Sequence, residues 1–148
     1  MLNNDYKDIL LALSNRKTKF LLVGAYAMAA HGYPRATIDI DLWVKPNSEN
    51  AALVLQALED FGAPTGGLSV DDLQTENVVF QIGVAPRRID IITSIDGLKF
   101  EDAFANSQKI DIDGIQVPVL SVPDLIKNKR STGRTKDLAD AESLEELT

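Results

Sequence analysis

The spacing of apolar and polar positions predicts that helices and strands alternate through the first part of the chain. Apolar residues recur at helical spacing in "DYKDILLALS", and a short apolar strand is predicted for "KFLLVG", ending at Gly24. A helix is predicted for "AYAMAAHG" and an alternating strand for "ATIDIDLWV". A longer helix is predicted for "SENAALVLQALEDFG", with Ser48 as its N-cap and Gly62 at its end.

The second half of the chain predicts paired strands and then two helices. No clear period runs through "APTGGLSVDDLQTE", which predicts a loop or a short turn of helix. An antiparallel pair is predicted for "NVVFQIGV" and "RRIDIITS", a short helix for "FEDAFANS" and a hairpin for "QKIDIDGIQVPVL". Two helices, joined at Gly133, are predicted for "SVPDLIKNKRS" and "TKDLADAESLEEL". The predicted fold class is therefore α/β (α+β), a mixed β-sheet with flanking helices.

Length and composition fit one globular domain over residues 1–148. Hydrophobic residues make up 45% of the chain and charged residues 25%, as in an ordinary globular protein. No run of about 18 apolar residues is present, and the N-terminus carries acids where a signal peptide needs a basic region. We therefore expect no membrane segment and a cytoplasmic location. The absence of cysteine excludes disulfides and thiolate metal sites.

The charge is acidic overall and basic in one place. A formal net charge of -7 argues against a general nucleic-acid binder, because phosphate repels such a chain. One stretch, "KNKRSTGRTK", concentrates Lys127, Lys129, Arg130, Arg134 and Lys136. This basic stretch is either a site for a small anionic ligand or a solvated helix face.

The tetrapeptide "IDID" occurs twice, and its first copy places two acids on one face of a strand. Asp39 and Asp41 point the same way because alternate strand residues share a face, while Ile40 and Leu42 point the other way. Two ionised carboxylates side by side repel each other and are costly to bury unpaired. Either a divalent cation with oxygen ligands offsets that repulsion, or the acids are solvated at a strand end.

The second copy is typical of a turn. Asp113-Gly114 is a strong signal for a two-residue hairpin, and aspartate tolerates the left-handed conformation there. Asp111 is free to face solvent. The stretch is not a calcium loop, because the twelfth position counted from Asp111 is Val122, where an EF-hand needs glutamate.

The first copy follows a glycine at a strand-to-helix junction. Gly24 lets a ligand approach the backbone closely, and the helix that begins after it offers free N–H groups to phosphate. An acid pair on the next strand would face the same ligand. Each feature alone is a weak signal, and the two together at this spacing are a stronger one.

These residues resemble the motif of the nucleotidyltransferase superfamily, which has the DNA polymerase β-like fold. Val23-Gly24-Ala25 is followed by thirteen residues and then by Asp39-Ile40-Asp41-Leu42. The second small residue of the motif is Gly or Ser in that superfamily, whereas here it is Ala25. A hydroxyl that could contact phosphate is therefore missing, although backbone N–H contacts survive the change.

The resemblance implies a third carboxylate from a later strand. Asp90, between two isoleucines in "RRIDIITS", has the expected order and context, whereas Asp96-Gly97 is more typical of a turn. The chemistry implied uses two Mg²⁺ ions about 3.5–4 Å apart, with Mn²⁺ as an alternative. Asp39 and Asp41 would bridge both metals, and Asp90 would bind the metal beside the nucleophile and help to deprotonate it.

The resemblance is closer to small stand-alone bacterial nucleotidyltransferase-like proteins, which include abortive-infection and toxin–antitoxin types. It spans "GYPRATIDIDLWV", "VFQIGVAPRRIDIITSIDG" and "DLIKNKRSTGRTKDLAD", and it implies a small partner protein as a further interaction. The pattern of that group implies that Lys129, Arg134, Lys136 and Asp137 border the site. Cations there can hold phosphate oxygens, and Asp137 with Asp140 would orient or neutralise them.

Four other residues are weighed between structural and functional roles. His31, the only histidine, is expected to pack or to interact with a helix end rather than to catalyse. Arg35 lies in the turn before the acidic strand, and contact with phosphate is one of two equally weighted interpretations, the other being no functional role. Arg88 shares a face with Asp90 and is expected to pair with it. Trp43 is expected to pack in the core rather than to stack on a base.

The function implied is a magnesium-dependent nucleotidyltransferase that moves NMP from an NTP, ATP or GTP, to a hydroxyl group. The acceptor is left open among a protein, an RNA end and a small molecule. The alternative is a catalytically decayed module that binds a nucleotide or a partner, which Ala25 and the small size favour. A metal-dependent phosphohydrolase is disfavoured because no histidine or glutamate base accompanies the acids.

Overall fold

The computed structural model of the protein describes residues 2–33, 39–84 and 87–146. Helices and strands alternate through the first half, as the sequence predicts, and a hairpin and two helices close the chain. In chain order the elements are α1 (Asn4–Asn15), β1 (Phe20–Val23), α2 (Gly24–Ala30), β2 (Asp39–Val44), α3 (Ser48–Phe61), α4 (Val70–Gln74), β3 (Val79–Ile82), β4 (Arg88–Ile92), α5 (Phe100–Asn106), β5 (Gln108–Ile112), β6 (Ile115–Val119), α6 (Val122–Thr132) and α7 (Thr135–Glu146).

One mixed sheet organises the fold, with the strand order β3-β4-β2-β1-β6-β5. β2 lies between β1, which pairs with it antiparallel, and β4, which pairs with it parallel. The end of β1 therefore meets the beginning of β2, where the acidic residues start. The predicted antiparallel pairing of β3 with β4 and the predicted hairpin of β5 with β6 are both confirmed.

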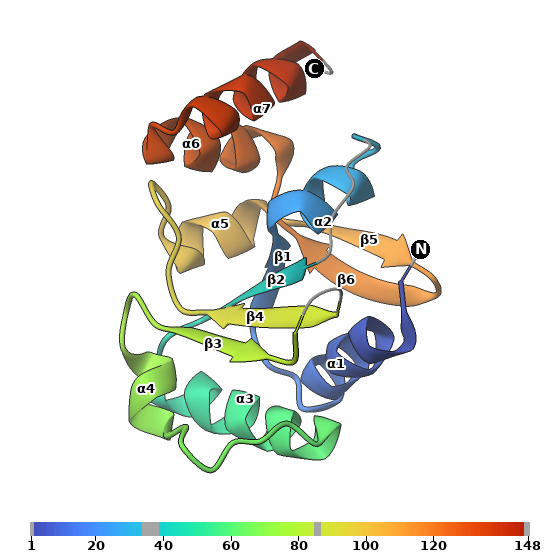
Figure 1. The fold of residues 1–148 in the computed structure, drawn as a ribbon, viewed down its shortest axis with the longest axis vertical. Coiled ribbons are helices and arrows are strands. Elements are labelled where there is room, and N and C mark those ends of the chain that lie inside the picture. The colour runs from blue at the N-terminus through green and yellow to red at the C-terminus, as the bar shows by residue number, and fades with distance from the viewer. Residues whose placement is uncertain (1, 34–38, 85–86, 147–148) are drawn as a thin grey trace.

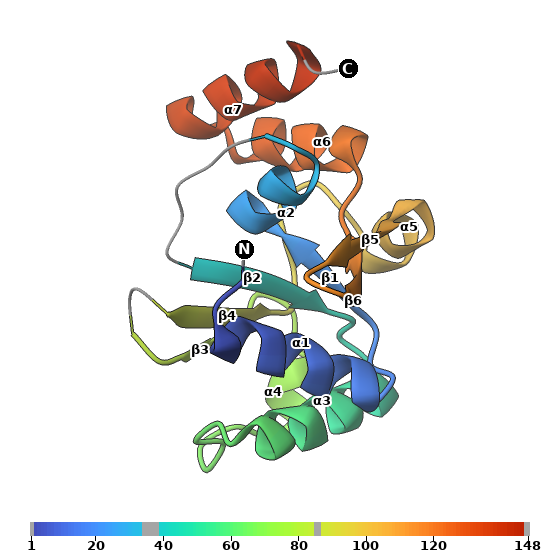
Figure 2. The same cartoon turned by 90° about the vertical axis from the view of Figure 1, so that its right-hand side faces the viewer.

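Helices cover both faces of the sheet. Figure 1 shows α1, α3 and α4 on one side, and Figure 2 shows α2, α6 and α7 stacked on the other. Side chains alternate between the two faces of β2. Ile40 and Leu42 are fully buried in the core, while Asp39 and Asp41 on the other face are partly exposed. Among the described residues, no helix combines the length and the apolar character needed to cross a membrane.

The second IDID copy forms the predicted turn. Asp113 has a φ of 51° and Gly114 a φ of 87°, so both adopt the left-handed conformation of a tight hairpin. The Gly114 amide donates to Asp111 Oδ1 at 2.9 Å, and the Leu2 amide donates to Asp113 Oδ2 at 2.8 Å. Both acids therefore have local structural roles in the hairpin or beside it.

One predicted helix cap is wrong by one residue. The N-cap of α3 is Asn47 rather than Ser48, because Asn47 has extended backbone and its side chain accepts from the Asn50 amide at 2.8 Å. Asparagine caps helices as well as serine does, so the two adjacent candidates could not be separated by residue type. The predicted helix ends at Gly62 and Gly133 are confirmed as left-handed C-caps.

Candidate active site

The register between β2 and β4 brings the three predicted carboxylates together. The Cα atoms of Asp41 and Asp90 are direct partners in this parallel pair, and Asp39 is partnered with Arg88. Because alternate residues share a face, all four side chains lie on the same side of the sheet. Asp90 is buried, with 7% of its surface exposed, so the cluster sits at the margin of the core rather than in open solvent.

Burial and the neighbouring acids raise the pKa of Asp41. Burial, the charge of Asp90 with its side-chain hydrogen bond, and the charge of Asp39 together raise the pKa of Asp41 to about 6. The nearby Arg88 guanidinium opposes the rise. Ionisation of Asp41 is therefore unfavourable in this arrangement.

Arg88 links the two strands across the acids. Its Nη2 donates to Asp39 Oδ2 at 2.6 Å and to Asp90 Oδ2 at 3.3 Å, and its Nε donates to Asp90 Oδ1 at 3.1 Å. The expected pairing of Arg88 with Asp90 is confirmed, but the contact with Asp39 was not foreseen. The planar guanidinium fork suits such bridging of two carboxylates.

Gly24 begins α2 where β1 ends, and it lies against Asp41. Its φ is +70°, a conformation that residues with a Cβ rarely adopt. A Cβ at this position would collide with Asp41 Oδ2 and would come within 3.3 Å of Asp41 Cγ. The corner therefore needs glycine both for its backbone and for the close approach. Ala25 follows it, partly exposed.

Tyr6 lies beside the cluster and packs against a second tyrosine, Tyr26. The Tyr6 hydroxyl donates to the backbone oxygen of Arg88 at 2.9 Å, and its ring packs edge-on against Tyr26 at 5.4 Å between centroids. Burial raises the pKa of Tyr6 to about 12, with smaller contributions from Tyr26 and from the three acids. No local pattern indicates this role, because Tyr6 is 82 residues from Arg88 and fits its helix as an apolar position.

The donor chemistry of the cluster suits a hard divalent cation, since carboxylate oxygens are the ligands that Mg²⁺ prefers. Even so, within residues 2–33, 39–84 and 87–146 no group of three or more His, Cys, Asp or Glu side chains is arranged to hold a metal ion. Arg88 instead engages oxygens of Asp39 and Asp90. A metal held by the three acids would need the same oxygens.

The basic stretch forms an ion-pair network between α6 and α7. Lys129 Nζ lies 3.3 Å from Asp137 Oδ1 and 3.4 Å from Asp140 Oδ2, and all three side chains are largely buried. Burial alone would raise the pKa of Asp137, but hydrogen bonds from Thr132, Lys129 and Arg134 outweigh it and lower the pKa. Lys129 is thus charge-balanced by the two acids that were expected to orient or neutralise it.

The remaining predicted phosphate-binding residues differ in exposure. Arg134 donates from Nε to Asp137 Oδ2 at 2.8 Å, yet 76% of its side chain is exposed. Lys136 lies exposed near the start of α7. Arg35 lies outside the described residues. The phosphate-binding roles of these cations stay predictions.

His31 and Trp43 have structural roles, as expected. His31 ends α2, and its Nε2 donates to the Leu120 backbone oxygen at 2.8 Å. Trp43 is buried, packs edge-on against Phe100 at 5.1 Å, and donates from Nε1 to the Thr93 oxygen at 3.2 Å.

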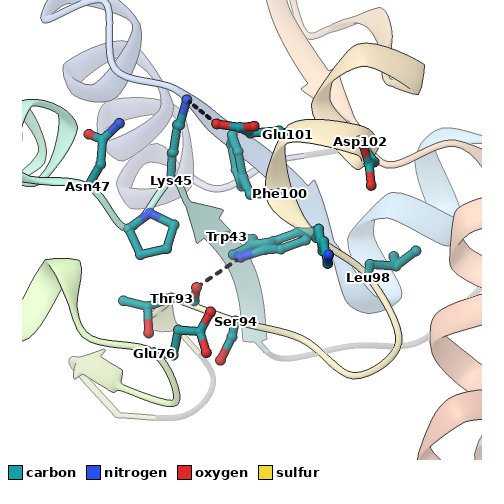
Figure 3. A pocket seen from close by; sticks show the side chains of 12 residues that line it. Trp43, Lys45, Asn47, Glu76, Thr93, Ser94, Leu98, Phe100, Glu101 and Asp102 are labelled. Atoms are coloured by element: carbon teal, nitrogen blue, oxygen red, sulfur yellow. Dashed lines mark hydrogen bonds and ion pairs between the residues drawn. The ribbon is translucent and has the colours of Figure 1, made fainter.

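A cavity of about 390 Å³ lies beyond the Trp43 end of β2. Figure 3 shows Lys45 paired with Glu101 on one side of it and Thr93 with Ser94 on another. The acids lie at the opposite end of β2, so this cavity is separate from the carboxylate cluster.

Comparison with known proteins agrees with this geometry at the level of the fold. No family model and no curated protein matches the chain. Solved structures do match, among them the following three. A Thermotoga maritima protein named as a candidate nucleotidyltransferase, TM1012, superimposes with a TM-score of 0.64 at 16% identity, over 99% of this chain and 94% of that one. The chain has the nucleotidyltransferase fold.

Two further structures are of proteins whose names refer to antibiotics or to antibiotic resistance. The lincosamide adenylyltransferase LnuA, solved with lincomycin, has a TM-score of 0.61 at 16% identity, over 100% of this chain and 99% of that one. The antibiotic-resistance factor ANT(2'')-Ia has a TM-score of 0.57 at 16% identity, over 95% of this chain and 80% of that one.

The contact between Gly24 and Asp41 predicts that Gly24→Ala costs more stability than Gly32→Ala. Gly32 also has a positive φ, +91°, but a Cβ there would meet nothing within 4 Å. Gly32→Ala should lose roughly 1–2 kcal/mol for its backbone alone. Gly24→Ala should lose at least about 1 kcal/mol more because of the collision. Urea unfolding, monitored by the fluorescence of the single tryptophan, measures both losses of stability. Equal losses would show that Asp41 is not held against the backbone at Gly24.

The raised pKa of Asp41 predicts that Asp41→Asn stabilises the metal-free protein in a pH-dependent way. The folded-state pKa of about 6 exceeds the ordinary value of 3.8, so ionised Asp41 opposes folding above pH 6 and ceases to do so below about pH 4. Asp41→Asn should therefore gain roughly 1–3 kcal/mol at pH 7.5, and the gain should vanish near pH 4. Unfolding in EDTA across this range tests it, with exposed Asp111→Asn as the unaffected control; a gain independent of pH would contradict the mechanism.

The Lys129 network predicts a large difference between two cations of the basic stretch. Lys129→Met leaves Asp137 and Asp140 buried without their shared partner and should cost about 3 kcal/mol or more. Arg134→Met removes a mostly exposed pairing and should cost less than about 1 kcal/mol. Chemical denaturation measures both, and similar costs would mean that Lys129 does not hold α6 to α7.

Proposed function

We propose that the protein is a magnesium-dependent nucleotidyltransferase that transfers NMP from an NTP to a hydroxyl group of an acceptor. The observation that carries this proposal is the pairing of Asp41 with Asp90 across β2 and β4, beside Asp39 and opposite the Gly24 corner. The nucleotidyltransferase fold of the chain supports it. A cytoplasmic location, expected from the sequence, would supply the nucleotide.

The reaction assigns a task to each group of the site. The acceptor oxygen attacks the α-phosphorus, the bond from that phosphorus to the bridging oxygen breaks, and pyrophosphate leaves. Asp90 is suited to accept the proton of the attacking hydroxyl, while Asp39 and Asp41 are suited to hold the divalent cations. When bound, those cations neutralise the triphosphate charge and activate the hydroxyl. Lys129, Arg134 and Lys136 are assigned to the phosphate oxygens, with Gly24 and Ala25 offering backbone N–H groups.

A small molecule is the acceptor class that the similarities favour. LnuA was solved with lincomycin and ANT(2'')-Ia is an antibiotic-resistance factor, so two proteins of similar fold are tied to small molecules. The net charge of -7 also argues against a long RNA, which would be repelled. A protein is the other acceptor class that we propose to test. The toxin–antitoxin type, with a small partner protein, is a further proposal that depends on such a partner being found.

A second candidate is a nucleotide-binding module without transferase activity. Two observations favour it: Ala25 offers no hydroxyl to phosphate, and Arg88 stands among the carboxylates that would hold metal. Both candidates predict nucleotide binding, and they differ in whether the α-phosphate is transferred.

The shared prediction is that ATP or GTP with Mg²⁺ raises the melting temperature. Binding to the folded state at a hundredfold excess over Kd stabilises by about 2.7 kcal/mol, or roughly 5–10 °C for a chain of this size. EDTA and Asp41→Asn should each abolish the gain, whereas Asp111→Asn should preserve it. Differential scanning fluorimetry measures the shift, and no shift at millimolar nucleotide would remove the nucleotide-binding proposal.

Label transfer then separates the two candidates. NTP labelled at the α-phosphate is incubated with Mg²⁺ and with a panel of hydroxylated small molecules, RNA ends and candidate partner proteins. Labelled product that requires Mg²⁺ and is lost in Asp41→Asn would establish a transferase. A thermal shift without any labelled product across the panel would favour the binding module.

A further inference from the structure

Arg88 has contacts that its position in a strand would not require. It is the Cα partner of Asp39 and stands two residues before Asp90 on the same strand face. Its guanidinium contacts both carboxylates at 2.6–3.3 Å and so places one positive charge among three acids. A surface arginine paired with one acid would be ordinary, but this one engages two of the three acids that are predicted to hold a divalent cation.

We propose that Arg88 is a resident counter-cation that must leave Asp39 and Asp90 before a divalent metal binds the carboxylate cluster. The metal and the guanidinium then compete for the same oxygens, and in the metal-free protein Arg88 offsets part of the negative charge of the site. This inference rests on the proposed function, because it takes the three acids as the metal ligands.

The environment of Arg88 permits the exchange without disturbing the fold. About a third of its side chain is exposed, 35%, whereas the side chain of Asp90 is 10% exposed. The backbone of Arg88 is held separately, because the Tyr6 hydroxyl donates to its oxygen at 2.9 Å and its strand pairs with β2. The side chain can therefore swing toward solvent while the strand and the acids stay in place.

The contacts of the acids agree with competition. In the described part of the chain no group of acids is arranged to hold a metal, although Asp41 and Asp90 are adjacent. Both oxygens of Asp90 and one oxygen of Asp39 engage the guanidinium instead. Released from them, the guanidinium fork would find matching acceptors in the phosphate oxygens of a nucleotide.

This exchange makes nucleotide and metal binding cooperative. A triphosphate that attracts Arg88 frees the carboxylates for metal, and by linkage the metal frees Arg88 for the triphosphate. Removing the guanidinium should therefore tighten metal binding in the absence of nucleotide. It should also reduce the extent to which a nucleotide tightens metal binding.

The experiment measures Mn²⁺ binding directly, by the electron paramagnetic resonance signal of free Mn²⁺, without any turnover. Arg88→Gln should bind Mn²⁺ about tenfold or more tightly than the unaltered protein, and a non-hydrolysable NTP should help it less. Arg87→Gln is the matched control, since Arg87 is the exposed neighbour and lies 3.9 Å from Asp5. It should behave as the unaltered protein does. Arg88→Lys keeps the positive charge without the guanidinium fork, so its Mn²⁺ affinity should lie between those of the unaltered protein and Arg88→Gln. This variant also tests the exchange if Arg88→Gln does not fold.

The outcomes separate this inference from the proposed function. Tighter Mn²⁺ binding in Arg88→Gln with unchanged binding in Arg87→Gln supports the exchange. Equal or weaker binding in both Arg88 variants, with Mn²⁺ still bound by the unaltered protein, overturns the exchange and leaves the proposed function standing. Absence of Mn²⁺ binding in every variant, with and without nucleotide, overturns both.

Discussion

The repulsion between carboxylates on neighbouring strands is the constraint around which this site is built. Asp41 and Asp90 face each other across β2 and β4, and the ladder between these strands fixes their backbones. The acids cannot separate without breaking the pairing, so the repulsion must be offset in place. Burial, together with the charges of Asp90 and Asp39, raises the pKa of Asp41 to about 6, and the guanidinium of Arg88 opposes this rise.

The surrounding structure holds this unfavourable arrangement rigid. Gly24 lets the β1–α2 corner approach Asp41 so closely that a Cβ would collide with the carboxylate. Tyr6 fixes the backbone of Arg88 from α1, a helix that is otherwise engaged in the core. A stable fold without a function would gain by replacing Asp41 with a neutral residue. Such a cost is typical of sites where stability is given up for chemistry, and it agrees with the function proposed for these acids.

Local patterns in the sequence predicted much of the fold and the placement of Asp39 and Asp41, whereas the resemblance to the nucleotidyltransferase superfamily implied Asp90 as the third acid. The alternation of side chains along a strand put Asp39 and Asp41 on one face. The dipeptide Asp113-Gly114 predicted the hairpin turn that the structure contains. Arg88 was placed beside Asp90 because the two are neighbours in one strand. Its bond to Asp39 spans 49 residues and depends on the register of β2 against β4, which no local pattern specifies. The predicted N-cap of α3 was wrong for a local reason. Asn47 and Ser48 are adjacent and equally suitable as caps, so residue type could not separate them.

The two IDID copies show that neighbours, not residue types, decide what an acid does. The first lies in β2, flanked by β1 and β4, so its acids meet Asp90 and Arg88 and cannot be freely solvated. The second lies at the end of β5, an edge strand, where Asp111 is exposed and accepts from its own turn. The one neighbour of β5 is β6, which pairs Gln116 with Asp111 and carries no acid. The neighbour of β2 on one side, β4, instead places Asp90 opposite Asp41, which is why the proposed chemistry belongs to the first copy.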